Sequence, residues 1–141
     1  MNEPTNRPRR SVLYVPAINA RAIAKARSLD TDTLIFDLED AVAPSMKAAA
    51  RANLVEAFAT GAFTQETVIR ANALGTPDHE ADLATVAACR PDAVLVPKVD
   101  SAAQLATFFA APATRQLPAG IGLWAMIETA ASLIGLDELV A

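Results

Sequence analysis

Five short apolar runs alternate with five segments of helical periodicity, and this order limits the fold more than any other feature of the sequence. Each apolar run is continuous, which is typical of parallel strands that are covered on both faces. The repeat of roughly 25 to 30 residues leaves room for one helix after each strand. The pattern predicts an α/β layer fold or a (β/α)8 barrel. The expected strands cover residues 11–17, 33–40, 67–73, 92–99 and 120–128.

Capping and turn residues indicate where the helices start and stop. Asn19 and Ser101 each precede a helical segment and are suited to cap it. Gly61 follows another helical segment and is suited to end it. The expected helices cover residues 19–29, 44–60, 78–89, 102–111 and 129–141.

Composition limits the size of the protein and its partners. The chain has 141 residues, 52% of them hydrophobic and 20% charged, so it can form one domain or a piece of a larger one. The net charge of −4 argues against nucleic acid as the main partner. No segment is apolar over a membrane-spanning length, and the N-terminus lacks the apolar core of a signal peptide. We therefore expect a cytoplasmic protein with no membrane partner.

The first ten residues differ from the rest of the chain. Residues 1–10 contain two prolines and a basic cluster of Arg7, Arg9 and Arg10, which we interpret as a solvated N-terminal arm. Residues 11–141 then form the domain.

Two common kinds of site are absent from the sequence. Cys89 is the only cysteine, so neither an internal disulfide nor a thiolate zinc cluster can form. Cys89 lies in an alanine-rich helical segment and is expected in the core. No G-x-G-x-x-G follows the first strand and no P-loop lysine motif is present, which removes the best sequence support for a nucleotide-binding sheet.

Charged and polar residues gather where the strands end. In a parallel barrel these strand ends meet at one face, which is the face that carries the active site. Four separate segments would therefore place acids, an arginine and a lysine on this one face, which we call the mouth of the barrel. The residues concerned are Asp37, Glu39, Asp40, Arg70, Asn72, Lys98 and Glu128.

Several of these residues also have a purely structural interpretation. Asp40 could pair with Lys47 or Arg51 of the following helix, and Glu128 could favour a helix start through the helix dipole. The cations of the mouth could simply neutralise its acids. Outside the mouth, Trp124 is expected in the core or at its rim, and His79 is expected as a surface or capping residue rather than as a base.

Carboxylates without histidine or thiolate neighbours suit a hard cation such as Mg²⁺, which prefers oxygen ligands. Arg70 offers a fork that can bind a substrate carboxylate through two hydrogen bonds. A cation and an arginine together would hold a 2-oxo or 2-hydroxy acid. The cation could then stabilise negative charge on oxygen as a carbon–carbon bond breaks or forms.

Five segments of the sequence occur together in a fixed order: "RSVLYVPAINARAIAKA", "DTLIFDLEDAVAPSMKAAAR", "VIRANALGTP", "DAVLVPKVDSAAQL" and "LWAMIETA". In this order they closely resemble the citrate lyase β subunit and CitE-like members of the HpcH/HpaI aldolase and citrate lyase superfamily. The resemblance implies a TIM barrel that uses Mg²⁺ on citryl, malyl or methylmalyl thioesters of coenzyme A (CoA) or an acyl carrier protein.

The resemblance also implies roles for residues of the mouth. Glu128 matches the first metal-ligating carboxylate of the family, and the second ligand is expected beyond Ala141. Mg²⁺ binding by the 141 residues is therefore expected to be weak or absent, with little lyase turnover. Arg70 matches the arginine that binds the carboxylate of the oxo acid and stabilises charge. Glu39 and Asp40 match acids that line the metal pocket, and Asp37 is expected to hold neighbouring side chains.

The thioester arm of the substrate is expected near the first helix. By resemblance, Asn19, Arg21 and Lys25 are candidates to bind it. For Lys98 a structural ion pair and a substrate contact remain equally open.

The chain is expected to form only about the first five β/α units, a partial barrel with two unpaired sheet edges. A fragment, a truncated product and a half-barrel completed by another chain remain open. The predicted function is an Mg²⁺-dependent carbon–carbon lyase that converts a 3-hydroxyacyl thioester into an oxo acid and an acetyl thioester. The alternatives are a non-catalytic remnant or assembly subunit, and a thioesterase or oxo-acid aldolase of the same superfamily. A homo-oligomer or a lyase complex is expected.

Overall fold

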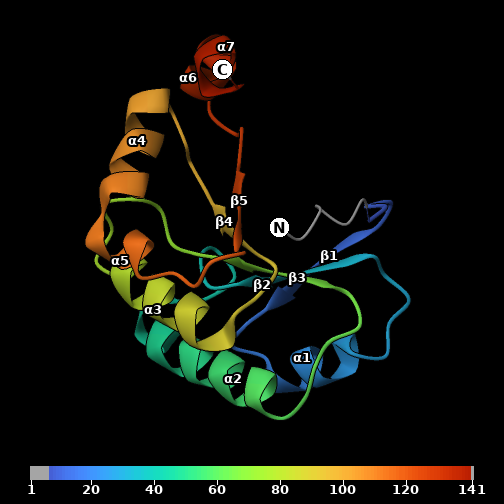
Figure 1. The fold of residues 1–141 in the computed structure, drawn as a ribbon. Helices are drawn as coiled ribbons and strands as arrows, with labels where there is room; N and C mark the ends of the chain where they lie inside the picture. Colours follow the sequence, from blue (N-terminus) through green and yellow to red (C-terminus); the bar gives the residue numbers. More distant parts are fainter. Residues whose placement is uncertain (1–6, 141) are drawn as a thin grey trace.

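The computed structural model describes residues 7–140, and their fold is an all-parallel five-stranded sheet with helices packed against it (Figure 1). The sequence-based order of strands is confirmed. Residues 1–6, which make up most of the predicted N-terminal arm, lie outside the described residues, as does Ala141. The strands are β1 (Val12–Pro16), β2 (Thr33–Asp37), β3 (Glu66–Arg70), β4 (Ala93–Val96) and β5 (Gly122–Ala125).

The helices follow the strands as expected, with two differences. A short helix not anticipated from the sequence, α5, precedes β5, and the last predicted helix is broken at Gly135 into two pieces. Asn19 and Ser101 cap their helices as predicted. The elements are α1 (Ala20–Ala26), the 3-10 turn η1 (Pro44–Met46), α2 (Lys47–Ala59), α3 (His79–Cys89), α4 (Ala102–Ala110), α5 (Pro112–Arg115), α6 (Ala130–Ile134) and α7 (Leu136–Val140).

The strands lie side by side in the order in which they occur in the chain, β1-β2-β3-β4-β5. Open doubly wound sheets reverse their strand order at a switch point. No reversal occurs here, and α1, α2 and α3 lie together on one side of the sheet (Figure 1). This is the arrangement of consecutive units of a β/α barrel, and the predicted barrel-type fold is confirmed for these five strands.

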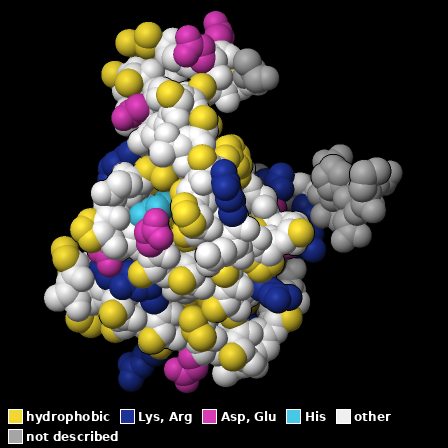
Figure 2. Space-filling model, turned by 60° about the vertical axis from the view of Figure 1, so that its left-hand side comes forward, with side chains coloured by type: hydrophobic (Ala, Val, Ile, Leu, Met, Phe, Trp, Pro, Cys, Tyr) yellow, Lys and Arg dark blue, Asp and Glu magenta, His cyan; other side chains and the backbone are white. Residues whose placement is uncertain are grey.

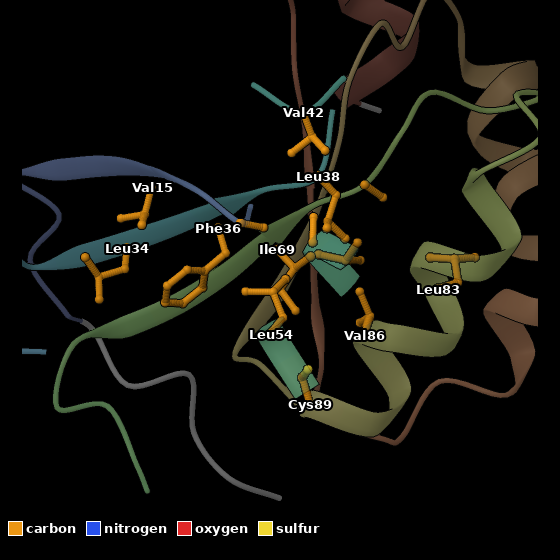
Figure 3. Close-up of a cluster of buried hydrophobic side chains, with 14 of the residues drawn as sticks. Val15, Leu34, Phe36, Leu38, Val42, Leu54, Ile69, Leu83, Val86 and Cys89 are labelled. Atoms are coloured by element: carbon orange, nitrogen blue, oxygen red, sulfur yellow. The ribbon is translucent and has the colours of Figure 1, made fainter. Parts of the chain in front are cut away.

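The main core lies between the sheet and the helices α2 and α3 (Figure 3). Phe36 and Ile69 project from adjacent strands and are fully buried against Leu54 of α2 and Val86 of α3. Burying one side chain of this size contributes about 1.5–3 kcal/mol. Cys89 joins the core as predicted, and burial raises the pKa of its thiol to about 11, so it is not a reactive thiolate.

The other face of the sheet, which would be the inside of a barrel, has a smaller apolar cluster. Ile35, Val68 and Leu95 are buried there, and the partly buried side chains of Trp124 and Met126 pack against them. The predicted position of Trp124 at the rim of the core is thereby confirmed. This inner face leads directly to the ends of the strands that carry the polar residues.

The described end of the arm is not simply solvated, which corrects the sequence-based interpretation. The Arg9 guanidinium donates two hydrogen bonds of 2.6 Å to the Glu66 carboxylate and lies 5.1 Å from the Trp124 ring. Arg10 pairs with Asp32 at 2.8 Å, although its side chain is largely exposed. Arg9 and Arg10 therefore attach this end of the arm to the amino-terminal end of the sheet.

No helix within residues 7–140 combines the length and the apolar content needed to cross a membrane.

Candidate functional site

The chain turns sharply where β2 ends, and Asp37 fixes the turn. One carboxylate oxygen of Asp37 accepts the backbone N–H of Glu39 at 2.8 Å, and the other accepts that of Ala41 at 3.1 Å. The strand thus ends three residues earlier than the sequence suggests. Glu39 and Asp40 therefore lie in a loop above the strand ends, and the loop's conformation depends on Asp37.

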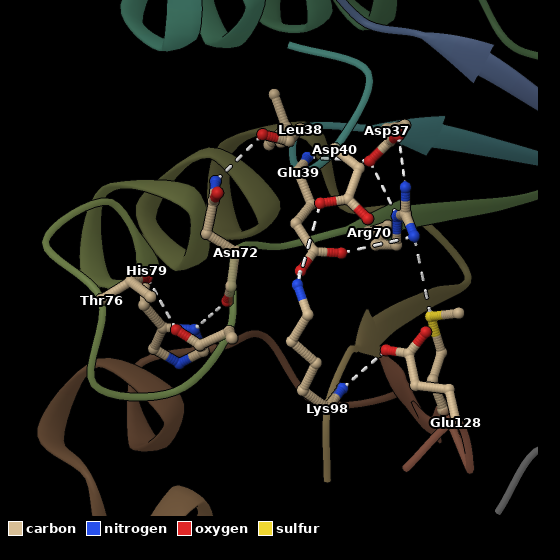
Figure 4. A network of polar contacts seen from close by, with 12 residues as sticks. Asp37, Leu38, Glu39, Asp40, Arg70, Asn72, Thr76, His79, Lys98 and Glu128 are labelled. Carbon is tan, nitrogen blue, oxygen red and sulfur yellow. Dashed lines mark hydrogen bonds and ion pairs between the residues drawn. The ribbon is translucent and has the colours of Figure 1, made fainter. Parts of the chain in front are cut away.

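Arg70, at the end of β3, is held by the same carboxylate. Its Nε and Nη2 groups donate to the two oxygens of Asp37 at 2.8 and 2.6 Å, and both side chains are almost fully buried (Figure 4). Burial acts to raise the pKa of Asp37, but the hydrogen bonds from Arg70 and from the Glu39 amide outweigh it and lower the pKa. The hydrogen bonds to Asp37 raise the pKa of Arg70. Both groups are therefore charged at neutral pH.

Glu39 lies between two cations. Its Oε1 accepts a 2.5 Å hydrogen bond from the Lys98 ammonium, and its Oε2 lies 3.3 Å from Nη1 of Arg70. Asp40, which is mostly exposed, lies 3.7 Å from the same ammonium. The structure thus brings together Arg70, Glu39, Asp40 and Lys98, as the sequence predicted for one mouth.

Glu128 joins this group through the backbone of Lys98. Its Oε1 accepts the Lys98 N–H at 2.8 Å (Figure 4). Lys98 has a positive φ of 53°, a conformation that costs a side-chain-bearing residue about 1–2 kcal/mol. The hydrogen bond to Glu128 and the ion pair to Glu39 hold the residue in that conformation, and they tie the ends of β2, β4 and β5 together.

Behind the loop lies a buried polar cluster that the sequence did not reveal. The Lys47 ammonium donates to the backbone oxygens of Leu38 and Glu39 at 2.7 and 2.6 Å, and to the Asn72 side chain at 2.8 Å. Asp82 accepts both the backbone and the side-chain N–H groups of Asn72, at 2.7 and 2.6 Å. Lys47 is thus a structural support of the loop that carries Glu39.

This cluster corrects the structural interpretation of Asp40. Neither Lys47 nor Arg51 pairs with it, because Lys47 points into the loop and Arg51 binds Asp78 and Asp82 at 3.0 and 2.9 Å. The described ionic partner of Asp40 is instead Lys98.

His79 is a buried residue, which corrects its predicted surface position. Its Nδ1 lies 2.7 Å from the backbone oxygen of Asn72, so Nδ1 carries the proton in this contact. Its Nε2 is buried without a hydrogen-bond partner among the described residues. His79 supports α3 and does not reach the charged residues of the mouth by any described contact.

A hollow of about 470 Å³ lies beside the mouth, and Glu39 and Lys98 form part of its lining. Asp40, Pro44 and Thr76 contribute to its walls. The segment beyond β5 rises above this end of the molecule and carries exposed apolar side chains, including Leu133 and Ile134 (Figures 1 and 2).

The predicted thioester residues are not joined to the mouth. The Asn19 side chain accepts the Ala22 N–H and caps α1. Arg21 and Lys25 are exposed on α1, and no described hydrogen bond or ion pair connects either to the charged cluster. Their role therefore remains a prediction.

Sequence reasoning missed Tyr14, whose ring lies 5.2 Å from the Arg70 guanidinium. Tyr14 pairs in register with Ile35, so it lies on the inner face of β1. The alternation of faces along a strand, counted from its end, could have indicated this position.

Oxygen ligands of the mouth suit Mg²⁺ in chemical type but do not form a complete site. Glu128 is exposed, and only one of its carboxylate oxygens has a described hydrogen bond, so the other is available to a metal ion. Within residues 7–140, no group of three or more His, Cys, Asp or Glu side chains is arranged to hold a metal. Glu128 could therefore supply one ligand to an ion that keeps water in other positions, as Mg²⁺ commonly does.

The parallel sheet keeps its strands in chain order and carries an arginine, a lysine and four carboxylates at its carboxyl end. It is a β/α-barrel-type fold with its polar site in the place usual for such folds. The HpcH/HpaI aldolase/citrate lyase family model matches residues 10–141. The chain belongs to this family.

Relatives within the family differ in their reactions. The chain is 41% identical over 135 residues to a (3S)-malyl-CoA thioesterase of Cereibacter sphaeroides, which is 95% of this chain and 45% of that protein. It is 35% identical over 98 residues to the citrate lyase subunit beta of Leuconostoc mesenteroides, which is 69% of this chain and 32% of that protein. The chain thus spans less than half the length of these relatives.

A solved structure shares the fold. Protein CitE from Mycobacterium tuberculosis, in complex with magnesium, acetoacetate and coenzyme A, matches with a TM-score of 0.74 and 34% identity. The match covers 95% of this chain and 46% of that one. The likeness extends over nearly all of the described sheet and helices.

Proposed function

We propose that this chain carries the acid-binding part of an Mg²⁺-dependent carbon–carbon lyase site that acts on a 3-hydroxyacyl thioester. The observation that carries the proposal is the buried Arg70–Asp37 pair at the carboxyl end of the sheet. Asp37 engages Nε and Nη2 of Arg70, which orients the guanidinium. Nη1 lies 3.3 Å from Oε2 of Glu39 and 3.9 Å from the Met126 sulfur. It makes no hydrogen bond to an oxygen among the described residues, so it can donate to the carboxylate of an oxo acid that displaces the Glu39 contact.

The charge of the mouth supports a cation. The mouth has four carboxylates and only two cations, Arg70 and Lys98, that pair with them or lie beside them. The carboxylates are those of Asp37, Glu39, Asp40 and Glu128. A divalent ion held by Glu128 would reduce this excess. When bound, Mg²⁺ would stabilise negative charge on an oxygen of the oxo acid.

The protein's own residues have separate tasks in this proposal. Arg70 binds and orients the acid, and Asp37 keeps Arg70 in place. Glu39 and Asp40 line the pocket, and Lys98 holds Glu39 until the substrate acid arrives. The thioester arm extends toward Asn19, Arg21 and Lys25, which stand along α1.

A thioesterase is the second candidate, and the 41% identity to a malyl-CoA thioesterase favours it. A lyase breaks a carbon–carbon bond and leaves the thioester intact on the acetyl product. A thioesterase adds water to the carbon–sulfur bond and releases a free thiol. The same arginine and carboxylates could bind the acid in either reaction.

The first test is calorimetric titration of the chain with Mg²⁺ in the presence of oxaloacetate. We expect weak but saturable binding that is lost in Glu128→Ala and in Arg70→Met. Asp137→Ala, which removes an acid in the first turn of α7, is the matched control and should leave binding unchanged. A folded wild-type chain that binds neither ligand would contradict the proposal and favour a non-catalytic assembly role.

The second test separates the two reactions. Malyl-CoA is incubated with the chain and Mg²⁺, and both the free thiol and glyoxylate are measured. Glyoxylate without free thiol supports the lyase, and free thiol without glyoxylate supports the thioesterase.

A further inference from the structure

Tyr14 stands beside the proposed acid-binding arginine. It lies on the inner face of β1, opposite Ile35 in register, and its ring centroid is 5.2 Å from Cζ of Arg70. A guanidinium at this distance from an aromatic ring is attracted by the electrons of the ring. Tyr14 therefore flanks Arg70 on the β1 side, while Asp37 binds it in the plane of the guanidinium.

Tyr14 is much more exposed than the residues that lie beside it on β2 and β3. It is 44% exposed, whereas Ile35 and Val68, in the same row of the sheet, are 3% and 0% exposed. No described hydrogen bond involves its hydroxyl group. A large side chain with an unused polar tip thus borders the mouth, where a ligand can reach it.

The charges around the phenol group affect its protonation state. Partial burial raises the pKa of Tyr14, Arg70 acts to lower it, and the carboxylates of Asp37, Glu128 and Glu39 act to raise it. These four charged groups all belong to the mouth. The net effect is a raised pKa, so the hydroxyl keeps its proton at neutral pH and can donate it in a hydrogen bond.

We propose that the Tyr14 hydroxyl group donates a hydrogen bond to a carboxylate oxygen of the acid that Arg70 binds, which makes Tyr14 a further binding residue of the site. The inference rests on the proposed function, because it takes the acid to be bound at Arg70. A neutral donor next to a cation suits a carboxylate, since both groups approach its lone pairs without competing for a proton. The ring keeps Arg70 in place, and the hydroxyl selects ligands that carry an acceptor.

The test compares oxaloacetate binding, in the presence of Mg²⁺, to the wild type, Tyr14→Phe and Tyr14→Ala by calorimetry. Phenylalanine keeps the ring beside Arg70 and removes only the hydroxyl. We expect about tenfold weaker binding by Tyr14→Phe, the loss usual for one hydrogen bond to a charged group. Tyr14→Ala should bind more weakly still, because it also removes the ring.

Val12→Ala is the matched control. Val12 lies two residues earlier on the same face of β1 and is also 44% exposed. It has no described contact with Arg70, so its truncation should leave the affinity unchanged. Thermal unfolding of each variant checks that the fold is retained.

A spectroscopic measurement supplies an independent readout. Tyr14 is the only tyrosine of the sequence, so the ultraviolet absorbance of phenolate reports on this residue alone. Oxaloacetate should shift the titration of the wild-type phenol to higher pH, because a donor bonded to an anion holds its proton more tightly.

The possible results separate the inference from the function. Equal affinities of the wild type and Tyr14→Phe, with an unshifted phenol titration, would overturn the role of Tyr14 and leave the proposed function standing. A wild-type chain that does not bind oxaloacetate would overturn both.

Discussion

Both ends of the parallel sheet hold an arginine that donates two hydrogen bonds to one carboxylate, but the pairs differ in burial. At the amino end, Arg9 is half exposed, and Oε2 of Glu66 also accepts the Thr33 hydroxyl at 3.0 Å. At the carboxyl end, Arg70 is buried with Asp37, and its Nη1 lies 3.3 Å from Oε2 of Glu39 and 3.9 Å from the Met126 sulfur.

The same residue pair can thus serve two purposes. A half-exposed pair attaches a surface segment to the sheet. A buried pair at the carboxyl end keeps a guanidinium N–H beside the mouth, and the protein must hold it in place by other contacts. Asp37 does this at the carboxyl end, because it binds Arg70 and the backbone of the loop at once.

The largest expected effect is at Asp37. Asp37→Ala should lower the free energy of unfolding by about 3–5 kcal/mol, because it leaves the Arg70 charge buried without its partner. Urea unfolding followed by circular dichroism measures the change. Asp40→Ala, which removes an exposed acid from the same loop, should change stability by less than about 0.5 kcal/mol. Similar losses in both variants would show that the buried Asp37–Arg70 pair contributes no more to stability than the exposed Asp40 does.

A smaller loss is expected when the support behind the loop is removed. Lys47→Met should lower the free energy of unfolding by about 1–3 kcal/mol, because the Glu39 backbone oxygen loses its buried donor. Lys25→Met, at an exposed lysine of α1, is the control and should have little effect. Both are measured by the same urea titration, and equal stabilities would mean that the loop holds its conformation without Lys47.

Loss of the Arg9–Glu66 pair should lower the free energy of unfolding less than Asp37→Ala or Lys47→Met does. Arg9→Met should reduce stability by about 1 kcal/mol or less, since the arginine is half exposed and solvent screens the interaction. The difference from wild type should shrink as salt is added. A loss as large as that of Asp37→Ala would remove the distinction between the two ends.

The smallest expected difference is in the response to acid. The pKa of Asp37 is lowered in the folded state, so its contribution to stability is present above the unfolded-state value of about 3.9. This contribution is lost as the pH falls through the lowered folded-state pKa. The pKa of Glu66 is lowered as well, chiefly by the hydrogen bond from Arg9. Unfolding free energies measured from neutral to acidic pH should therefore fall less steeply in Asp37→Ala, and in Glu66→Gln, than in the wild type.

Much of the fold could be predicted because it depends on local patterns. The five apolar runs formed strands in the expected order, and Asn19 and Ser101 cap helices through hydrogen bonds within one turn. The break at Gly135 and the short helix after Ala111 were not predicted, because they depend on how the chain packs beyond β4.

The sequence predicted which residues form the charged site but not how they pair. Charges at strand ends identified Arg70, Glu39 and Lys98, since parallel strands bring their carboxyl ends together. The partners of Asp40 and Arg9 were wrong or missing, because they depend on loop conformation and on contacts far apart in sequence. Arg9 and Glu66, for instance, are 57 residues apart.

The neighbour-to-neighbour order of the strands has a consequence for how the protein folds. Every described strand pairs with strands adjacent in the sequence, so its partner lies close along the chain. Loop-closure entropy stays low for these pairings, because none of them joins distant segments. The described part of the sheet can therefore form strand by strand during synthesis, with α1, α2 and α3 covering one face of it.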